Sequence, residues 1–335
     1  MIIHIGYPKT ATTTLQLNLY AKMHEEGKIE YLNHLNSPSN YLGEFYCGNA
    51  LRYIMGMSDD YGVKEELEKF KKINNTISLI SNENISFFSE NYSWAYHNSD
   101  ASKNAQRICD TFSPYFDDIQ ILIFTRAQAT IIPSFYGQCL NHIVSKKPIF
   151  NNMQKWLDAN FYNKLNDEKL IFNYDFMYDS YCKEFGADKT KVCLFEDLSN
   201  NQNRIATTLS LLFNVEKEYV NKSINRTNKK NVTIKNNLNQ VKASSSSLMN
   251  RFVYYYNKYL SYFIKIEKAK KIKNKLLKII PNFILGIEFK NKSRGLSNEE
   301  KIKILNKYEK VNLSLMNKLG YTKEEMINYL YLNGY

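Results

Sequence analysis

The sequence has few residues of the kinds that hold metal ions or form disulfides. Its 335 residues include only five cysteines and five histidines. The cysteines form no C-x-x-C pair, and the histidines show no spacing typical of metal ligands. Scattered cysteines of this kind suit free thiols in a reducing compartment. We therefore expect no metal site, and thiols that stay reduced.

Long apolar runs are also missing. No stretch of about 18 uninterrupted apolar residues occurs, and the apolar start of the chain is too short for a signal peptide. We therefore expect a cytoplasmic protein. Hydrophobic residues make up 44% of the chain, which is enough to build a core and excludes global disorder. The length suits one large α/β domain with additions, or two modest domains.

Acidic residues are scarce in one region. Residues 229–310 hold 20 Lys and Arg residues against five Glu and no Asp, an excess of +15 in a chain whose net charge is +12. One interpretation is a basic helical arm that contacts an anionic membrane surface through residues 250–280, at the inner face of the membrane, or guides an acidic polymer. We favour the other, a helical extension packed on the core with a solvated lysine face. No recognised nucleic-acid motif is present, so we expect no nucleic-acid partner.

Apolar periodicity predicts strands that alternate with helices. The expected strands are Ile2–Ile5, Ile29–Leu32, Ile77–Ser81, Ile119–Thr125 and Val192–Phe195. The expected helices are Leu15–Met23, Val63–Asn75, 101–112, Trp156–Phe161, Ile171–Phe185, Arg204–Phe213 and Asn298–Leu319, the last with Ser297 as its cap and Gly320 as its stop. This order predicts an α/β fold with a parallel sheet flanked by helices.

The first strand runs into the first helix through a loop rich in threonine, Gly6 to Thr14. Such a loop before a helix offers free backbone N–H groups and the positive end of the helix dipole, which together attract anions. When the nucleotide-binding pattern G-x-x-x-x-G-K-[ST] is laid on the chain from Gly6, Thr12 stands where the lysine that reaches the ATP phosphates should be. The lysine comes earlier, at Lys9. In the simpler interpretation, the threonines only cap a helix.

A second motif follows the strand Ile119–Thr125. Arg126 stands at the end of this strand, and Pro133 suits the first turn of the next helix, with Ser134 beside it. Arginine offers a fork of donors to phosphate oxygens, and a hydroxyl near a helix start adds another. In the structural alternative, Arg126 makes a surface ion pair and Ser134 caps the helix.

Both motifs resemble elements of the sulfotransferase family. Pro-Lys-Thr-Ala-Thr-Thr, which begins at Pro8, is similar to the family's 5'-phosphosulfate loop, P-K-[TS]-G-[TS]-[TS]. Ala11 stands in place of the family's glycine; an alanine fits where the backbone is helical, so we expect the substitution to be tolerated. Arg126 with Ser134 resembles the family's 3'-phosphate element. A strand followed by Glu196-Asp197-Leu198 also resembles the family, and we interpret Glu196 and Asp197 as mainly structural.

The resemblance covers about residues 1–230 and implies a P-loop-like α/β domain there, with a basic helical extension over 231–335. It implies transfer of a sulfuryl group from 3'-phosphoadenylyl sulfate to a hydroxyl or amine, without a divalent metal. The nucleotide-binding residues that it implies are Lys9, Thr10, Ala11, Thr12, Thr13, Thr14, Arg126, Ser134, Arg226 and Asn228.

Glu83 is our candidate for the base that takes a proton from the acceptor. It directly follows the strand Ile77–Ser81, and its surroundings resemble the glutamate segment of carbohydrate sulfotransferases, although Asn84 replaces the lysine that usually follows. His97 and His142 are the reserve candidates. The expected acceptor is a glycan or a small molecule, with carbohydrate preferred because many aromatic side chains are available to stack on sugar faces.

Two other functions remain open. A P-loop kinase would use ATP with magnesium to phosphorylate a small molecule, but Thr12 replaces its lysine. A non-catalytic protein would bind nucleic acid or membrane through the basic residues 229–310. Its affinity would fall steeply with salt and would survive loss of the Lys9 side chain.

Overall fold

The structure is a computed structural model that describes residues 1–7, 9–32, 48–54, 63–68, 77–86, 100–146, 152–158, 172–225 and 296–334. These residues belong to two compact units. The first unit holds the described residues up to Ser134 together with 172–225 and 296–334. The second includes 135–146 and 152–158. The candidate site lies in the first unit.

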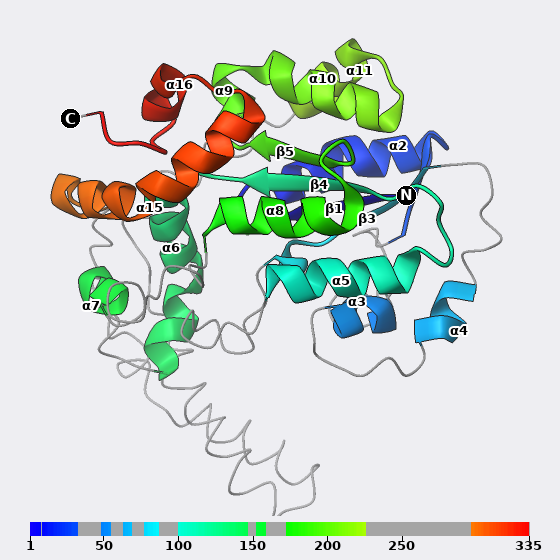
Figure 1. Ribbon diagram of the computed structural model, residues 1–335, viewed down its shortest axis with the longest axis horizontal. Coiled ribbons are helices and arrows are strands. Elements are labelled where there is room, and N and C mark those ends of the chain that lie inside the picture. The colour runs from blue at the N-terminus through cyan, green and yellow to red at the C-terminus, as the bar shows by residue number, and fades with distance from the viewer. Residues whose placement is uncertain are drawn as a thin grey trace, which may run out of the picture. The chain divides into compact units, whose positions relative to one another are not determined.

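Five parallel strands form the sheet of the first unit, in the order β2-β3-β1-β4-β5 (Figure 1). The strands are β1 Ile2–Gly6, β2 Ile29–Tyr31, β3 Ile77–Ser81, β4 Gln120–Thr125 and β5 Thr190–Leu194. In the central strand β1, Ile3 pairs with Ile80 of β3 and with Ile121 of β4. The prediction of a parallel sheet flanked by helices is confirmed, and β5 begins two residues earlier than Val192.

Helices cover both faces of this sheet. One face carries α1 Thr12–Leu15, the π-helical turn η1 Gln16–Tyr20, α2 Ala21–Glu25, α10 Gln202–Phe213 and α11 Lys217–Asn225. On the other face lie α3 Gly48–Ile54, α5 Ala101–Phe112 and α8 Tyr174–Phe185 (Figure 1). The helix after β1 thus lies on the opposite face from α5, which follows β3. Connections that diverge in this way leave a crevice beyond the carboxyl ends of the strands.

The remaining described helices complete the chain. They are α4 Val63–Glu68, the 3-10 turn η3 Glu83–Ile85, α6 Gln128–Lys146, α7 Met153–Leu157, α9 Asp197–Asn200, α15 Asn298–Leu319 and α16 Lys323–Asn328. In the second unit, the ring of Tyr136 lies 5.1 Å from that of the buried Trp156. Residues 69–75 of the expected helix Val63–Asn75 lie outside the described residues.

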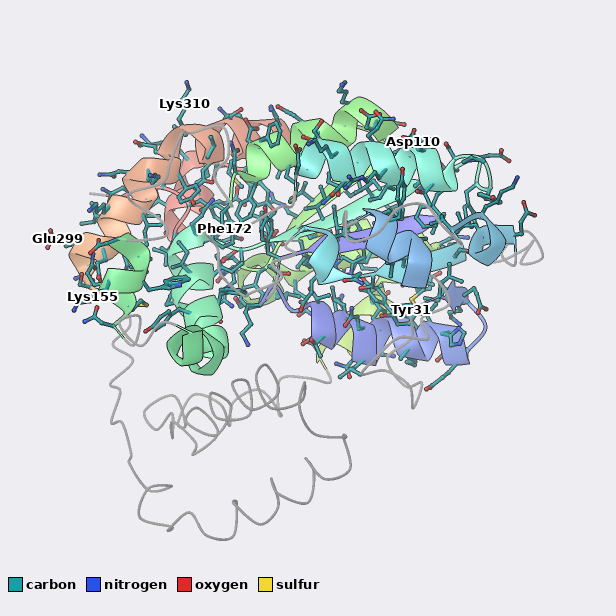
Figure 2. All side chains as sticks on the ribbon, turned by 90° about the horizontal axis from the view of Figure 1, so that it is seen from below. Tyr31, Asp110, Lys155, Phe172, Glu299 and Lys310 are labelled. Carbon is teal, nitrogen blue, oxygen red and sulfur yellow. The ribbon has the colours of Figure 1, made fainter. Side chains whose placement is uncertain are left out.

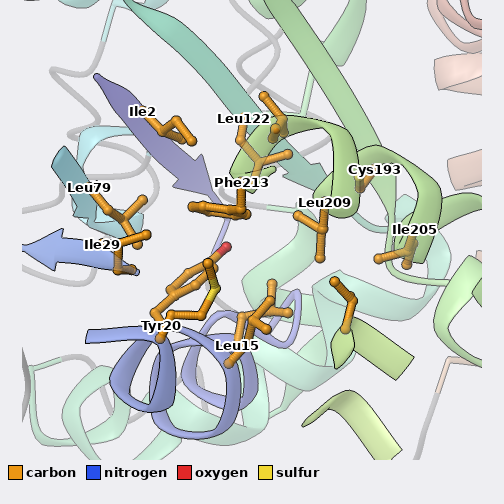
Figure 3. Close-up of a cluster of buried hydrophobic side chains, with 14 of the residues drawn as sticks. Ile2, Leu15, Tyr20, Ile29, Leu79, Leu122, Cys193, Ile205, Leu209 and Phe213 are labelled. Atoms are coloured by element: carbon orange, nitrogen blue, oxygen red, sulfur yellow. The ribbon is translucent and has the colours of Figure 1, made fainter. Parts of the chain in front are cut away.

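One core cluster fixes the first helix against the sheet. Apolar side chains from the strands, from α1 and η1, and from α10 converge there (Figure 3). The predicted helical spacing is confirmed, because Leu15, Leu19 and Met23 are all buried in this cluster. Each fully buried side chain of this size contributes about 1.5–3 kcal/mol. The loop between β1 and α1 is therefore anchored at both ends.

Residues 296–334, which we call the C-terminal segment, also belong to the first unit. Its helix α15 begins with a capping box formed by Ser297 and Glu300 and ends at Gly320, which has a φ of 72°, as predicted. Lys318 near its end pairs with Asp175 and Asp179 of α8. Figure 2 shows Lys310 of α15 pointing outward and Phe172 inside the unit.

Two helix starts differ from the prediction. The helix after β4 begins at Gln128, so Pro133 lies inside it rather than in its first turn. The reason is that Gln128 is fully buried and its side-chain amide bonds to Asn312, which fixes the helix start at that point. Helix α8 begins at Tyr174 instead of Ile171, because the side chain of Asn173 accepts a hydrogen bond from the N–H of Phe176 and caps it.

Candidate functional site

The loop after β1 packs tightly against β4 at its first residue. A Cβ added to Gly6 would lie 3.1 Å from Thr10 Oγ1 and 3.3 Å from Phe124 Cβ, closer than ordinary contacts. The next amide, that of Tyr7, donates to the carbonyl oxygen of Phe124 at 3.3 Å. Glycine therefore allows the loop to leave β1 while still touching its neighbour strand.

Two of the predicted threonines support the loop from inside. Thr10 is fully buried, and its hydroxyl donates to the carbonyl oxygen of Tyr7 at 2.7 Å. Thr12 is also buried, with its hydroxyl 3.3 Å from that of Thr10. Thr13, by contrast, is exposed. The hydroxyls of Thr10 and Thr12 thus shape the loop, whereas Thr13 faces solvent.

The backbone at Ala11 corrects one expectation. Ala11 has a φ of 65° and a ψ of 16°, so it is left-handed rather than helical. Lys9 is left-handed too, with a φ of 73°. A Cβ in this region approaches the following carbonyl oxygen, which costs about 1–2 kcal/mol. The reason given for tolerating alanine is therefore wrong, because the position favours glycine.

Replacing Ala11 by glycine is expected to stabilise the protein. Relief of the left-handed backbone outweighs the extra freedom of glycine in the unfolded chain, for a net gain of roughly 0.5–1 kcal/mol in the free energy of unfolding. Urea denaturation measures the change. Ala21→Gly is the matched control, because Ala21 has a helical φ of −59° and the same substitution there should destabilise by about 1 kcal/mol. If both variants lost the same free energy of unfolding, that result would contradict backbone strain at Ala11.

The helix that begins at Thr12 presents free donors to the loop. Ala11 is its N-cap and offers no side-chain acceptor, and its first turn has no acidic residue. Within the described part of the chain, no carbonyl accepts a hydrogen bond from the N–H groups of Thr13 and Thr14. Helical backbone continues through η1 and α2 to Glu25, which gives a dipole of several turns. These features together favour an anion.

Arg126 joins the two predicted motifs. One guanidinium nitrogen donates to the carbonyl oxygen of Lys9 at 2.9 Å, and Nε donates to Thr130 Oγ1 at 3.0 Å. The guanidinium also lies over the ring of Phe195, 4.3 Å from its centroid. The side chain is only partly buried. A partly exposed arginine thus stands directly beside the loop that carries Lys9.

Ser134 has a different place from the one expected. It lies in the second turn of α6, partly buried, and among the described residues no hydrogen bond links it to Arg126. Thr130 holds Arg126 instead. Sequence reasoning missed Thr130 because it placed the helix start at Pro133. With the start at Gln128, Thr130 falls in the first turn of α6, close in sequence to Arg126 at the end of β4.

Glu83 lies within electrostatic reach of Lys9. It begins η3, directly beyond β3, where the N–H of Asn82 donates to the carbonyl oxygen of His4 at 3.0 Å. Burial raises the pKa of the Glu83 carboxyl, and the positive charge of Lys9 acts in the opposite direction. A carboxyl group and a lysine that follow two neighbouring strands, β3 and β1, therefore interact electrostatically.

A buried polar network supports this strand end. The side-chain amide of Gln16 donates to both the carbonyl oxygen and the hydroxyl of Ser81, each at 3.0 Å. The same hydroxyl lies 2.8 Å from Nδ1 of His4, which also lies 3.3 Å from the hydroxyl of Tyr20. Burial lowers the pKa of His4 to about 3, so this histidine is neutral. The sequence held no signal for these contacts, which join residues up to 77 apart.

Four consecutive residues at the end of β4 are each fixed by a different part of the first unit. The hydroxyl of Tyr331 lies 3.3 Å from that of Thr125, and the hydroxyl of Tyr174 donates to the carbonyl oxygen of Arg126 at 2.7 Å. Glu196 accepts the N–H of Ala127 at 3.0 Å. Finally, Gln128 and Asn312 exchange two amide hydrogen bonds, at 2.9 and 3.0 Å. This set of contacts holds Arg126 in place.

Several predicted residues cannot be assigned a position in the site. Pro8, His97, Arg226 and Asn228 lie outside the described residues, as do residues 229–295 with most of the basic region. His142 belongs to α6, but its side chain is not among those described. The roles proposed for these residues remain predictions.

Over the ranges that the structure describes, no group of three or more His, Cys, Asp or Glu side chains could hold a metal ion. None of the helices in those same ranges is both long and apolar enough to cross a bilayer.

Comparisons with known proteins give one result. No protein-family model matches the chain, and no curated protein matches it by sequence. Among solved structures, the chain is similar to the crystal structure of a sulfotransferase from Alicyclobacillus acidocaldarius, with 15% identity, a TM-score of 0.35, and coverage of 64% of this chain and 81% of the other.

Proposed function

We propose that this chain is a sulfotransferase that uses 3'-phosphoadenylyl sulfate as its donor. The observation that carries the proposal is the hydrogen bond from Arg126 to the carbonyl oxygen of Lys9. It brings together, at neighbouring strand ends, two motifs that resemble the two phosphate-binding elements of that family. They lie 117 residues apart in the sequence.

The residues at these strand ends suit a donor with two phosphate groups. The free N–H groups of Thr13 and Thr14 and the side chain of Lys9 would hold the 5'-phosphosulfate, at the positive end of the helix dipole. The guanidinium of Arg126, with the hydroxyl of Thr130 beside it, would hold the 3'-phosphate. Arg226 and Asn228 remain proposed contacts on the resemblance alone. The donor supplies the sulfuryl group and a nucleotide that can leave with its charge stabilised.

Lys9 and Glu83 would have different roles in the transfer of the sulfuryl group. The acceptor oxygen forms a bond to sulfur while the bond from sulfur to the bridging phosphate oxygen breaks. Lys9 would stabilise the negative charge that develops on the departing phosphate. Glu83, which lies within electrostatic reach of Lys9, would take the proton that the acceptor hydroxyl loses. We propose a carbohydrate acceptor, on the resemblance of the Glu83 segment to carbohydrate sulfotransferases.

Calorimetric titration with 3',5'-adenosine bisphosphate, the product nucleotide, tests this function. The titration is made in the presence of a chelator, in parallel with ATP plus magnesium. Tight binding of the bisphosphate that is lost in Lys9→Ala and Arg126→Ala supports a sulfotransferase. Binding of ATP alone would instead support a kinase. If neither nucleotide binds, the two motifs are structural.

Replacing Glu83 by glutamine is expected to lower turnover by about 100- to 10,000-fold, because the acceptor proton then has no base. Affinity for the bisphosphate should be nearly unchanged. A base must be ionised to act, and burial raises the pKa of Glu83. The acidic limb of the pH–rate profile should therefore lie above the range of an ordinary glutamate. The rate is measured as bisphosphate released from the donor in the presence of a panel of oligosaccharides.

Glu25→Gln is the matched control, since Glu25 is exposed at the end of α2. It should change neither turnover nor the pH profile. Normal turnover in the Glu83→Gln variant would remove Glu83 from the mechanism and would direct attention to His97 and His142.

A further inference from the structure

Glu196 lies within electrostatic reach of Arg126, and no salt bridge between these two described residues accompanies the interaction. It precedes α9 at the end of β5 and is partly buried. One carboxyl oxygen accepts the N–H of Ala127 at 3.0 Å, and the other accepts the hydroxyl of Tyr331 at 3.3 Å. Both carboxyl oxygens thus accept hydrogen bonds from the protein itself. The carboxyl group lies close to Arg126, the residue that would hold a phosphate.

Few titratable groups in the described part of the chain act on the Glu196 carboxyl. The groups that act on it are the guanidinium of Arg126 after β4, the phenol of Tyr174 at the start of α8, and the phenol of Tyr331 from the C-terminal segment. The neighbouring Asp197 accepts hydrogen bonds from the phenols of Tyr321 and Tyr329 instead. Among the described residues, Arg126 is therefore the positive charge that stabilises an ionised Glu196, and an anion bound to Arg126 would oppose it.

We propose that the binding of an anion at Arg126 is coupled to protonation of Glu196. The coupling rests on the proposed function for the identity of the anion, a nucleotide phosphate, but its physical basis is general. A phosphate on the far side of the guanidinium cancels the field that keeps Glu196 ionised. Protonated Glu196 still accepts the N–H of Ala127 through its carbonyl oxygen, so the loop keeps its geometry.

The resting state of the carboxyl suits this coupling. Burial raises the pKa of Glu196 to about 7, against the opposing effects of Arg126 and the hydrogen bonds from Ala127 and Tyr331. A bound anion would raise this pKa further. The complex then holds more protons than the free protein, so affinity falls as pH rises above about 7, by at most about tenfold per pH unit.

Calorimetry in two buffers with different heats of ionisation counts the protons taken up on binding. The ligands are 3',5'-adenosine bisphosphate and, separately, inorganic sulfate, at about pH 8, where the phosphate groups are already ionised. We expect the wild-type protein to take up a fraction of a proton per site. Glu196→Gln, which keeps the acceptor for Ala127, should bind with no uptake and with a flat pH profile.

The outcomes separate this inference from the proposed function. Bisphosphate binding with the same proton count in wild type and Glu196→Gln would overturn the coupling and leave the function standing. Sulfate binding with uptake that is lost in Glu196→Gln, but no binding of the bisphosphate, would support the coupling and overturn the function. Failure of both ligands to bind would overturn both.

Tyr331→Phe gives a second, independent readout. The hydroxyl of Tyr331 lowers the pKa of Glu196, so its removal should raise that pKa and move the fall in affinity to higher pH. A purely structural role for Tyr331 would weaken binding equally at every pH. Glu218→Gln, at an exposed position of α11, is the matched control and should reproduce the wild-type profile. Circular dichroism and thermal unfolding establish that each variant is folded.

Discussion

Replacing Lys9 by alanine is expected to lower the rate of sulfuryl transfer by about 1,000-fold while leaving the fold intact. The loss is large because the charge of Lys9 would act where negative charge develops in the transition state. The fold should survive because the Lys9 side chain is exposed and its bond to Arg126 is made by the main-chain carbonyl, which alanine keeps. Donor turnover and thermal unfolding measure the two effects.

Two further variants make this result specific. Lys9→Met keeps most of the side-chain length and removes only the charge, so it should match Lys9→Ala in turnover. Lys64→Ala removes an exposed lysine from α4 and should leave turnover unchanged. If Lys9→Ala keeps a rate within about threefold of wild type, then Lys9 does not take part in transfer, because even one lost donor to the transition state costs more than that.

Replacing Arg126 by alanine is expected to weaken binding of 3',5'-adenosine bisphosphate by about 100- to 10,000-fold. The guanidinium would make two charge-assisted hydrogen bonds to the 3'-phosphate, and each such bond contributes about 1.5–3 kcal/mol. Turnover at saturating donor should fall much less, because Arg126 would not contact the group that is transferred. Calorimetric titration gives the affinity, and the dependence of rate on donor concentration separates the two effects.

Arg107→Ala is a close control for this variant. Arg107 of α5 also donates to a main-chain carbonyl, that of Ile54 at 3.4 Å, and lies 5.9 Å from an aromatic ring centroid, that of Tyr53. Its loss should affect stability alone. Arg126→Lys keeps the positive charge but loses the paired N–H donors of the guanidinium. Its affinity for the bisphosphate should therefore lie between those of the wild type and of Arg126→Ala. Unchanged affinity in Arg126→Ala would contradict the assignment of the 3'-phosphate to this side chain.

Sequence patterns were sufficient to predict the parallel sheet and the position of the loop between β1 and α1. Runs such as Ile119–Thr125 have branched apolar residues at consecutive positions, which suits strands that are buried on both faces. The spacing of Leu15, Leu19 and Met23 likewise predicted a helix that packs on the sheet, and all three are buried. These features depend on the physical chemistry of neighbouring residues, which a single sequence displays directly.

Backbone conformation was not predictable in the same way. Alanine is a strong helix former, so a helical φ at Ala11 was the natural expectation. The left-handed conformation arises instead because the loop must turn within a few residues between two anchors, Gly6 against β4 and Leu15 in the core. The helix start at Gln128 was missed for a related reason, since its partner Asn312 lies 184 residues away.

The C-terminal segment likewise combines features that were predictable from the sequence with contacts that were not. Ser297 and Gly320 mark the ends of α15 locally, and both were predicted. That Asn312 and Tyr331 would contact the end of β4 depends on tertiary packing, for which the sequence has no local signal. Glu196 was interpreted from the sequence as mainly structural, because its contacts with Ala127 and Tyr331 have no local signal.

The contact between Thr125 and Tyr331 also has a consequence for synthesis of the protein. These residues are 206 positions apart, so β4 leaves the ribosome long before the tyrosine that holds its end. During that interval the side chain of Gln128 lacks its two hydrogen bonds to Asn312, although its amide can still donate to the carbonyl oxygen of Phe172, at 3.1 Å. A nascent chain that stops before residue 312 therefore lacks the contacts that Asn312 and Tyr331 make at the end of β4, although it can already form those of Tyr174 and Glu196. We expect the full set of contacts at the end of β4 to form late in translation, after the sheet itself can form.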